Sequence, residues 1–307
     1  MKKDLKWIAF ICLVGLAGFI GLSTLVAGCG ERQETTLYYY GPSWTRAGDL
    51  ILIKGLQTVR KDVIGTQLGS SYTESLVTMS TAGAAETFLL DVTNKPPYSM
   101  SVSPVSDYLL YLDELRSGLF GKAVILNIAA GAHTGLDKVE LAFNPGIKAA
   151  DWSSDGQKIV YCTTAEVRTV NLDGTGDTLV VAANELSFVA WKNGSRIAFV
   201  YNNGTDNVLS LIKADGTGRV DLAAAASVAD PQIDPLNNNL IWGLAGGSFC
   251  GTDAGAAVPA TSEVLAGCKA DLPRLNQAGG KIVYDKLGEQ SGVYLLDLAT
   301  SAESKVK

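Results

Sequence analysis

This chain of 307 residues contains few of the residues that form metal and redox sites. It has one histidine and five cysteines, and no two of the cysteines form a C-x-x-C motif. A histidine-rich catalytic metal site is therefore excluded, as is a zinc-binding or redox C-x-x-C motif. The single histidine, His133, lies in the turn-like segment AAGAHTG, where we expect an ordinary surface residue. The serine-hydrolase elbow G-x-S-x-G, the dinucleotide fingerprint G-x-G-x-x-G and the P-loop are also missing, which argues against these chemistries.

Basic residues are outnumbered: 25 Lys and Arg face 31 Asp and Glu, for a net charge of -6. Without a basic stripe the chain has no means of displacing counterions from phosphates, so we expect no nucleic acid partner. With 47% hydrophobic residues, the chain is long enough to bury a full core.

The N-terminal region differs from the rest of the chain. Lys2, Lys3 and Lys6 precede an apolar run that ends at Gly28, WIAFICLVGLAGFIGLSTLVAG. A positive head, an apolar stretch and small residues are typical of a secretory signal peptide. The run is also long enough to cross a bilayer, so an uncleaved membrane-spanning anchor is the alternative.

The residues that end this run, Val26-Ala27-Gly28-Cys29, resemble the bacterial lipobox. The resemblance implies that residues 1–28 are removed as a lipoprotein signal peptide and that Cys29 is acylated. Its acyl chains would bind membrane lipid and hold the protein in the cell envelope, with residues 29–34 as a short tether. Gly30 after the cysteine favours the outer membrane, facing the periplasm, over the inner membrane.

Six copies of one pattern occupy the remaining chain. In each copy a large apolar residue is followed about seven positions later by a short apolar run. The leading residues, spaced 58, 50, 39, 42 and 42 positions apart, are Trp44, Val102, Trp152, Trp191, Ile233 and Leu275. A period near 42 that continues to the C-terminal region is typical of a repeat architecture.

A second alternating segment follows most copies and ends in turn residues. In DWSSDGQKIVYCTTAEVRTVNLDGTG, Asp155-Gly156 and Asp173-Gly174 each separate short apolar runs, which is a strong hairpin signal. Each repeat is therefore predicted to form a four-stranded antiparallel sheet. Such sheets cover their faces when six of them pack in a ring, whereas a sandwich would need no fixed period.

We therefore predict an all-β, six-bladed β-propeller over residues 35–307. Residues Thr35–Tyr40 and Ala302–Lys307 are both candidates for the outer strand that closes the ring.

ADWSSDGQKIVY followed by VNLDGTG resembles the blade repeat of TolB-type propellers, P-x-W-S-P-D-G-x-x-I-x-F followed by N-x-D-G-x-G. The segments GPSWTRAGDLILI and FVAWKNGSRIAFV match it in part. The resemblance covers about half of the chain and implies the propeller fold.

Two further features have structural explanations. Cys250 and Cys268 bracket a Gly- and Ala-rich stretch, and in an exported protein such a pair favours a disulfide over a metal site. Cys162 lies in an apolar run and is expected to be buried and inert. Asp173 and Asp177 resemble half of a calcium loop, but no Glu follows at the required spacing, and turn chemistry accounts for both. We predict no cofactor and no metal, with a calcium ion held by carboxylates alone as the alternative.

Longer inserts between predicted strands are the candidate binding face. They are Gln57–Tyr72 and Asp113–Lys122, together with the blade-joining segment Lys95-Pro96-Pro97-Tyr98. Aromatic and basic side chains in such loops are good interface anchors, although solvated loops without a partner are the alternative. The candidate residues are Arg60, Lys61, Tyr72, Tyr98, Arg116 and Phe120.

The leading functional hypothesis is a membrane-tethered extracytoplasmic scaffold that binds an envelope protein or polysaccharide, with no catalysis. The alternative is a small-ligand binder or enzyme that uses the central channel, which would require polar side chains to converge at the mouths of the inner strands. A third possibility is a propeller that only stabilises a larger envelope assembly.

Overall fold

The computed structural model describes residues 31–307 except 84, 94–96, 114–121, 130–137, 141–145, 192–195, 226–227, 234–238, 244–248, 254–261, 266–269, 277–279 and 287–290. The described chain divides into two compact parts. We call residues 31–36 and 57–71 the ribbon, and residues 37–56 and 72–307 the propeller. Across these described ranges, no helix has the length and apolar character needed to cross a membrane.

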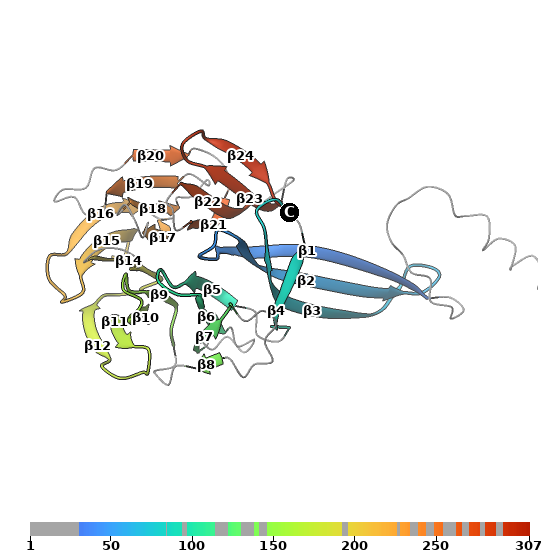
Figure 1. The fold of residues 1–307 in the computed structure, drawn as a ribbon, viewed down its shortest axis with the longest axis horizontal. Coiled ribbons are helices and arrows are strands. Elements are labelled where there is room, and N and C mark those ends of the chain that lie inside the picture. The colour runs from blue at the N-terminus through green and yellow to red at the C-terminus, as the bar shows by residue number, and fades with distance from the viewer. Residues whose placement is uncertain are drawn as a thin grey trace, which may run out of the picture. The chain divides into compact units, whose positions relative to one another are not determined.

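Six four-stranded sheets, here called blades one to six, follow one another along the chain (Figure 1). Blade one contains β1 (Arg32–Trp44), β2 (Leu50–Lys61), β3 (Gln67–Met79) and β4 (Glu86–Asp91). Blade two contains β5 (Pro97–Val102), β6 (Tyr108–Asp113), β7 (Ala123–Asn127) and β8 (Lys138–Glu140). Blade three contains β9 (Ala149–Trp152), β10 (Lys158–Cys162), β11 (Glu166–Asn171) and β12 (Thr178–Ala182).

The second half of the ring repeats this arrangement. Blade four contains β13 (Phe188–Ala190), β14 (Arg196–Asn202), β15 (Asn207–Lys213) and β16 (Val220–Ala225). Blade five contains β17 (Ala229–Ile233), β18 (Asn239–Gly243), β19 (Phe249–Asp253) and β20 (Ser262–Leu265). Blade six contains β21 (Ala270–Leu275), β22 (Lys281–Lys286), β23 (Gly292–Asp297) and β24 (Ala302–Lys305). In every blade the strands neighbour one another in sequence order, as hairpin connections require.

The Asp-Gly pairs lie where the sequence predicted the chain to reverse. Asp155-Gly156 joins β9 to β10, which pair through Ile159 and Trp152, and Asp173-Gly174 joins β11 to β12. Both glycines have positive φ, 65° and 81°, a backbone region that glycine enters without a steric penalty. These turns set the register of the blade pattern.

The core lies between blades rather than within one sheet. Trp152 and Ile159 of blade three pack on Leu110 of blade two, and similar clusters join blades one and two, three and four, and four and five. Trp44 and Leu52 of blade one share a cluster with Val283 and Val293 of blade six, which closes the ring. The predicted six-bladed propeller is confirmed.

In the part of the chain that the structure describes, blades six and one share no strand. β24 is the outer strand of blade six, whereas Leu37–Tyr40 belongs to β1, the inner strand of blade one. Of the two candidates for the closing outer strand, the C-terminal segment therefore takes that place. Blades six and one meet through side-chain packing and through hydrogen bonds between a side chain of one blade and the backbone of the other.

Two expectations for the N-terminal half need correction. The insert Gln57–Tyr72 is not a long loop: β2 continues to Lys61 and β3 starts at Gln67, so only a short turn joins them. β1 begins at Arg32, so the end of the expected tether over residues 29–34 is part of a strand. Ion pairs and hydrogen bonds across the ribbon explain why these polar sequences are extended.

Candidate binding site

The predicted anchors Arg60 and Lys61 lie at the end of β2, in the ribbon. The Lys61 ammonium is 2.5 Å from a carboxylate oxygen of Glu34, and the Arg60 guanidinium is 3.9 Å from Glu31. This pairing lowers the pKa of the Glu34 carboxyl, chiefly through the hydrogen bond from Lys61. The two basic side chains therefore hold the ribbon strands together.

Tyr72 lies in β3 and is partly covered by its neighbours. Its ring stacks on Tyr38 with centroids 5.9 Å apart, and its hydroxyl donates to the buried carboxylate of Glu74. Tyr40 donates to the same oxygen of Glu74, and burial followed by this bond raises the pKa of Tyr40. Tyr72 is thus part of an intramolecular network, although 37% of its surface is exposed.

Other predicted sites fall partly or wholly outside the described residues. Tyr98 lies in β5, at the start of blade two. Cys29, His133, Arg116 and Phe120 lie outside the described residues.

The channel-facing strands use their polar groups to connect blades. Ser101 donates its hydroxyl to Asp151, whose other carboxylate oxygen accepts the backbone N–H of Trp191 at 2.8 Å. The indole of Trp152 donates to the carbonyl of Ser101 at 2.9 Å. These groups of blades two, three and four therefore have structural partners.

A hollow of about 540 Å³ opens at the seam between blades six and one. Its lining comes from four strands: residues 37–40 of β1, the C-terminal ends of β22 and β24, and the start of β23. It is lined by Leu37, Tyr38, Tyr39, Tyr40, Asp285, Lys286, Ser291, Gly292, Lys305 and Lys307. We call this hollow the seam pocket.

Lysines supply most of the charge of the seam pocket. Lys286 is 2.7 Å from the carboxylate of Glu303, and its ammonium lies 4.7 Å from the centroid of the Tyr294 ring. Lys305 donates to the backbone carbonyl of Ser291 at 2.9 Å, and no carboxylate of the described residues lies within ion-pair distance of it. Lys305 therefore offers a cation to a ligand.

Lys307 joins the opposite wall. Its ammonium lies 3.8 Å from Glu86 and 5.2 Å from the centroid of the Tyr39 ring. Glu86 is also bound by Lys54 at 2.6 Å and accepts the Tyr39 hydroxyl. Burial raises the pKa of the Glu86 carboxyl, but the bonds from Lys54 and Tyr39 outweigh it and lower that pKa overall. Glu86 is therefore an anion that orients Tyr39 and Lys307.

The one acid in the lining is also engaged. Asp285 accepts the backbone N–H of Gly41 at 2.8 Å, which ties β22 to β1 across the seam. The pocket thus presents lysine ammonium groups beside the rings of Tyr38, Tyr39 and Tyr40. Such a surface favours a ligand with acidic groups and a flat or apolar part.

Gly292, one of the residues that line the seam pocket, allows two backbone segments to approach closely. It has φ of 146°, and a Cβ there would lie 2.2 Å from the carbonyl oxygen of Lys307. The close approach allows Val293 to donate its backbone N–H to Lys307 at 3.0 Å, which fixes the C-terminal residue against β23. The position of the Lys307 side chain therefore depends on this glycine.

The cysteine predictions are tested only in part. Cys162 is buried in β10, and burial raises the pKa of its thiol to about 12, so it is unreactive as expected. Cys250 lies in β19, but Cys268 is outside the described residues, so the disulfide stays a prediction.

The aspartates of the supposed calcium half-loop have protein partners. Asp173 accepts the backbone and hydroxyl of Thr175, whereas Asp177 accepts Tyr161 and the Arg168 guanidinium. Among the residues that the structure describes, no group of three or more His, Cys, Asp and Glu side chains is placed to hold a metal.

Comparison with known proteins gives structural matches without sequence matches. No protein-family model matches the chain, and no curated protein matches it. TolB from Acinetobacter baumannii superposes with a TM-score of 0.59 at 9% identity, over 89% of this chain and 79% of that one. A chain of a nidogen/laminin complex gives 0.58 at 12% identity, over 89% and 92%.

An oligogalacturonate lyase in complex with manganese gives 0.52 at 14% identity, over 90% of this chain and 85% of that one. Identities this low establish shared architecture and leave activity to be argued from the site. The chain has a TolB-like β-propeller fold.

Proposed function

We propose that this protein is a binding module of the bacterial cell envelope, tethered to membrane lipid through Cys29, that engages an acidic group of an envelope partner in the seam pocket. The observation behind this proposal is the pocket itself, in which Lys286, Lys305 and Lys307 surround a tyrosine-lined hollow. The outer membrane, facing the periplasm, is the proposed location. The tether and the location rest on the sequence alone.

The electrostatics of the seam pocket favour an anion. Lys286 and Lys307 each have a carboxylate neighbour, whereas Lys305 is held by a carbonyl, which leaves its charge uncompensated. A carboxylate or sulfate that replaces water at Lys305 gains a charge-assisted hydrogen bond. The adjacent tyrosine rings add contact area at small entropic cost. An acidic side chain or a uronate-bearing polymer would satisfy both features.

A role for the central channel remains the alternative hypothesis. It is less well supported, because the inner-strand groups Ser101 and Asp151 bond to neighbouring blades. The seam pocket is therefore the better candidate.

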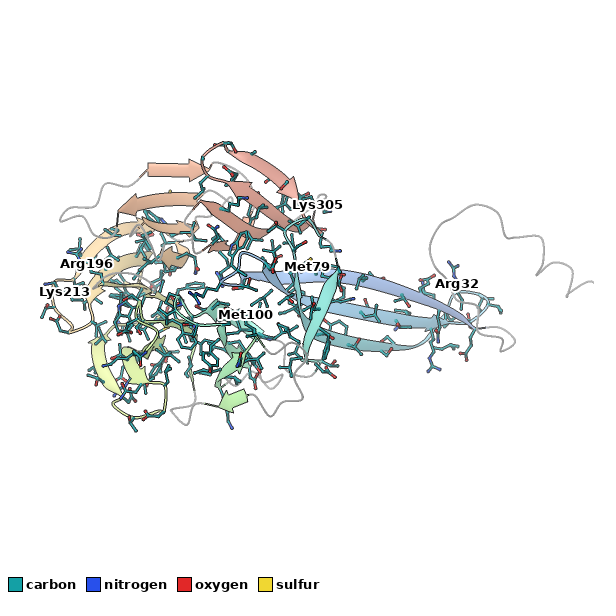
Figure 2. All side chains as sticks on the ribbon, in the orientation of Figure 1. Arg32, Met79, Met100, Arg196, Lys213 and Lys305 are labelled. Atoms are coloured by element: carbon teal, nitrogen blue, oxygen red, sulfur yellow. The ribbon has the colours of Figure 1, made fainter. Side chains whose placement is uncertain are left out.

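The test places a photoreactive benzoylphenylalanine at position 291 and, as a control, at position 213 of the full chain in intact cells. Ser291 is an exposed residue of the pocket lining, and only its backbone carbonyl accepts Lys305, so the cation stays in place. Figure 2 labels Lys305, at the end of β24, and Lys213, at the end of β15. We expect a specific adduct at position 291 that is lost in about 0.5 M salt, where charges are screened within a few ångströms.

The charge is tested separately. Lys305→Glu should weaken recovery of the same partner about tenfold, equivalent to roughly 1.4 kcal/mol, while Lys213→Glu leaves it unchanged. Equal adducts at both positions, or binding that is insensitive to the Lys305→Glu exchange, would contradict the proposal.

A further inference from the structure

We propose that the turn between β2 and β3 inserts two apolar side chains into the lipid surface to which the chain is tethered. Val63 and Ile64 form the apex of this turn, with 81% and 84% of their surfaces exposed. Turn positions normally hold Gly, Pro, Asn, Asp or Ser, each for a conformational reason. Two adjacent β-branched apolar residues therefore need another explanation. The inference rests on the proposed acylation of Cys29.

The turn is rigid enough to present these side chains. Asp62 and Gly65 close it through two backbone bonds, Asp62 N–H to Thr66 at 2.9 Å and Gly65 N–H to Asp62 at 3.1 Å. The Asp62 carboxylate also accepts the N–H groups of Ile64 at 3.0 Å and Thr66 at 2.8 Å. These hydrogen bonds lower the pKa of the Asp62 carboxyl, and the bond from the Thr66 backbone N–H has the largest effect. Because the turn is already fixed by these bonds, it loses little conformational entropy when its apex enters the lipid.

The chain enters the ribbon beside this turn. Glu31 and Glu34 pair with Arg60 and Lys61, the residues that immediately precede Asp62. The start of β1 therefore lies against the end of β2, and Figure 2 shows Arg32 at that end of the ribbon. Cys29 precedes Glu31 by two residues, a reach of no more than roughly 7 Å. The lipid attachment point and the apolar apex consequently belong to the same end of the ribbon.

The charges of the ribbon identify the kind of surface. Three cations, Arg32, Arg60 and Lys61, balance three anions, Glu31, Glu34 and Asp62. Because the ribbon has no net charge, it is not attracted to anionic lipids in particular. Its affinity for a bilayer must therefore come from the apolar side chains of Val63 and Ile64. We therefore expect shallow insertion into neutral phosphatidylcholine as well as into anionic bilayers, with little dependence on salt.

The experiment uses the full chain reconstituted in phosphatidylcholine vesicles that contain a lipid with a taggable acyl chain. Benzoylphenylalanine replaces Ile64 in one variant and Ser70 in the control. Ser70 is an exposed position of the same ribbon, and it lies about 17 Å along β3 from the turn. Circular dichroism checks the fold of both variants, and mass spectrometry of the N-terminal peptide reports whether Cys29 is acylated.

We expect lipid cross-linking at position 64 to exceed that at position 70 several-fold, and to persist at high salt. Equal cross-linking with acylated Cys29 overturns the insertion but leaves the tether. Cross-linking at position 64 with unmodified Cys29 supports insertion and removes the tether from the proposed function. If native envelopes give a protein adduct at position 64 in place of lipid, a protein partner occupies the apex and the insertion is wrong.

Discussion

Gly156 shows how one residue can determine both a turn and a contact between blades. Its φ of 65° lies in the left-handed region, and a Cβ on it would come within 2.4 Å of Val105 Cγ2 in blade two. The turn between β9 and β10 must therefore contain a residue without a side chain, for conformational and for steric reasons.

Replacing this glycine separates the two effects. Gly156→Ala should lower the free energy of unfolding by about 2 kcal/mol, from backbone strain plus the displaced valine. Gly204→Ala is the matched control, because Gly204 has φ of 98° but a Cβ added to it would meet nothing within 4 Å, and it should cost about 1 kcal/mol. Urea denaturation measures both. An equal loss in the two variants would mean that the contact with Val105 has no energetic weight.

Single-residue predictions from the sequence succeeded where the cause was local. Burial of Cys162 followed from its position in an apolar run. The predicted anchors Arg60, Lys61 and Tyr72 have partners inside the molecule, and those partners come from other strands. Contacts of this kind depend on strand pairing, which the sequence pattern does not specify residue by residue.

At the scale of the element, the large residue at the end of the inner strand has a recurring role. Trp152 donates its indole N–H to Ser101 of blade two, and Trp44 donates to Arg274 of blade six at 2.8 Å. In each case the acceptor is the residue just before the leading apolar residue of the preceding repeat. The bond therefore locks one inner strand to the next.

Exchange of these tryptophans for phenylalanine tests how much the hydrogen bonds between blades contribute to stability. Trp44→Phe and Trp152→Phe should each lower the free energy of unfolding by about 1 kcal/mol beyond the packing change, because the hydrogen bond between neighbouring blades is removed. Trp191→Phe is the control, since the buried indole N–H of Trp191 has no hydrogen-bond partner in the described structure. Thermal unfolding of the three variants gives the comparison. Equal shifts would show that packing alone determines the loss.

The strand pattern was predictable because apolar alternation and Asp-Gly turns are local signals. The extension of β2 and β3 was not, because QTVRKDVIGTQLGSSY contains few apolar residues and the end of β2 is held by ion pairs to Glu31 and Glu34, at the start of β1. A polar insert of this composition predicts a loop unless the partner strand is known.

At the scale of the whole molecule, the candidate site exists only because the ring closes. Leu37–Tyr40 and Lys305–Lys307 lie at opposite ends of the sequence, and the seam brings them to one pocket. No local motif marks either segment. The sequence therefore predicts the propeller but not the pocket.

The ionisable groups predict a stability maximum between acid and alkaline limits. Among the described residues, folding lowers the pKa of nine acidic groups: Asp62, Asp91, Asp155, Asp173, Asp215, Asp297, Glu34, Glu86 and Glu303. The unfolded chain therefore binds more protons in acid, and stability falls below about pH 4.5. Folding raises the pKa of Tyr39, Tyr40, Tyr72 and Tyr161, so that stability also falls above about pH 10.

Tyrosinate absorbance tests the alkaline limit. Four of the eleven tyrosines should ionise only as the protein unfolds, and circular dichroism should change with them. Ionisation of all tyrosines near pH 10 with an intact fold would contradict the expected protection.

The seam between blades six and one also sets the order of folding during synthesis. Trp44 and Leu52 are made long before Val283 and Val293, the residues that cover them. A nascent chain must therefore keep this face of its first blade uncovered until blade six has been synthesised. Chains truncated before blade six should be degraded more readily by proteases, and circular permutants opened at another blade junction should fold as readily as the natural order.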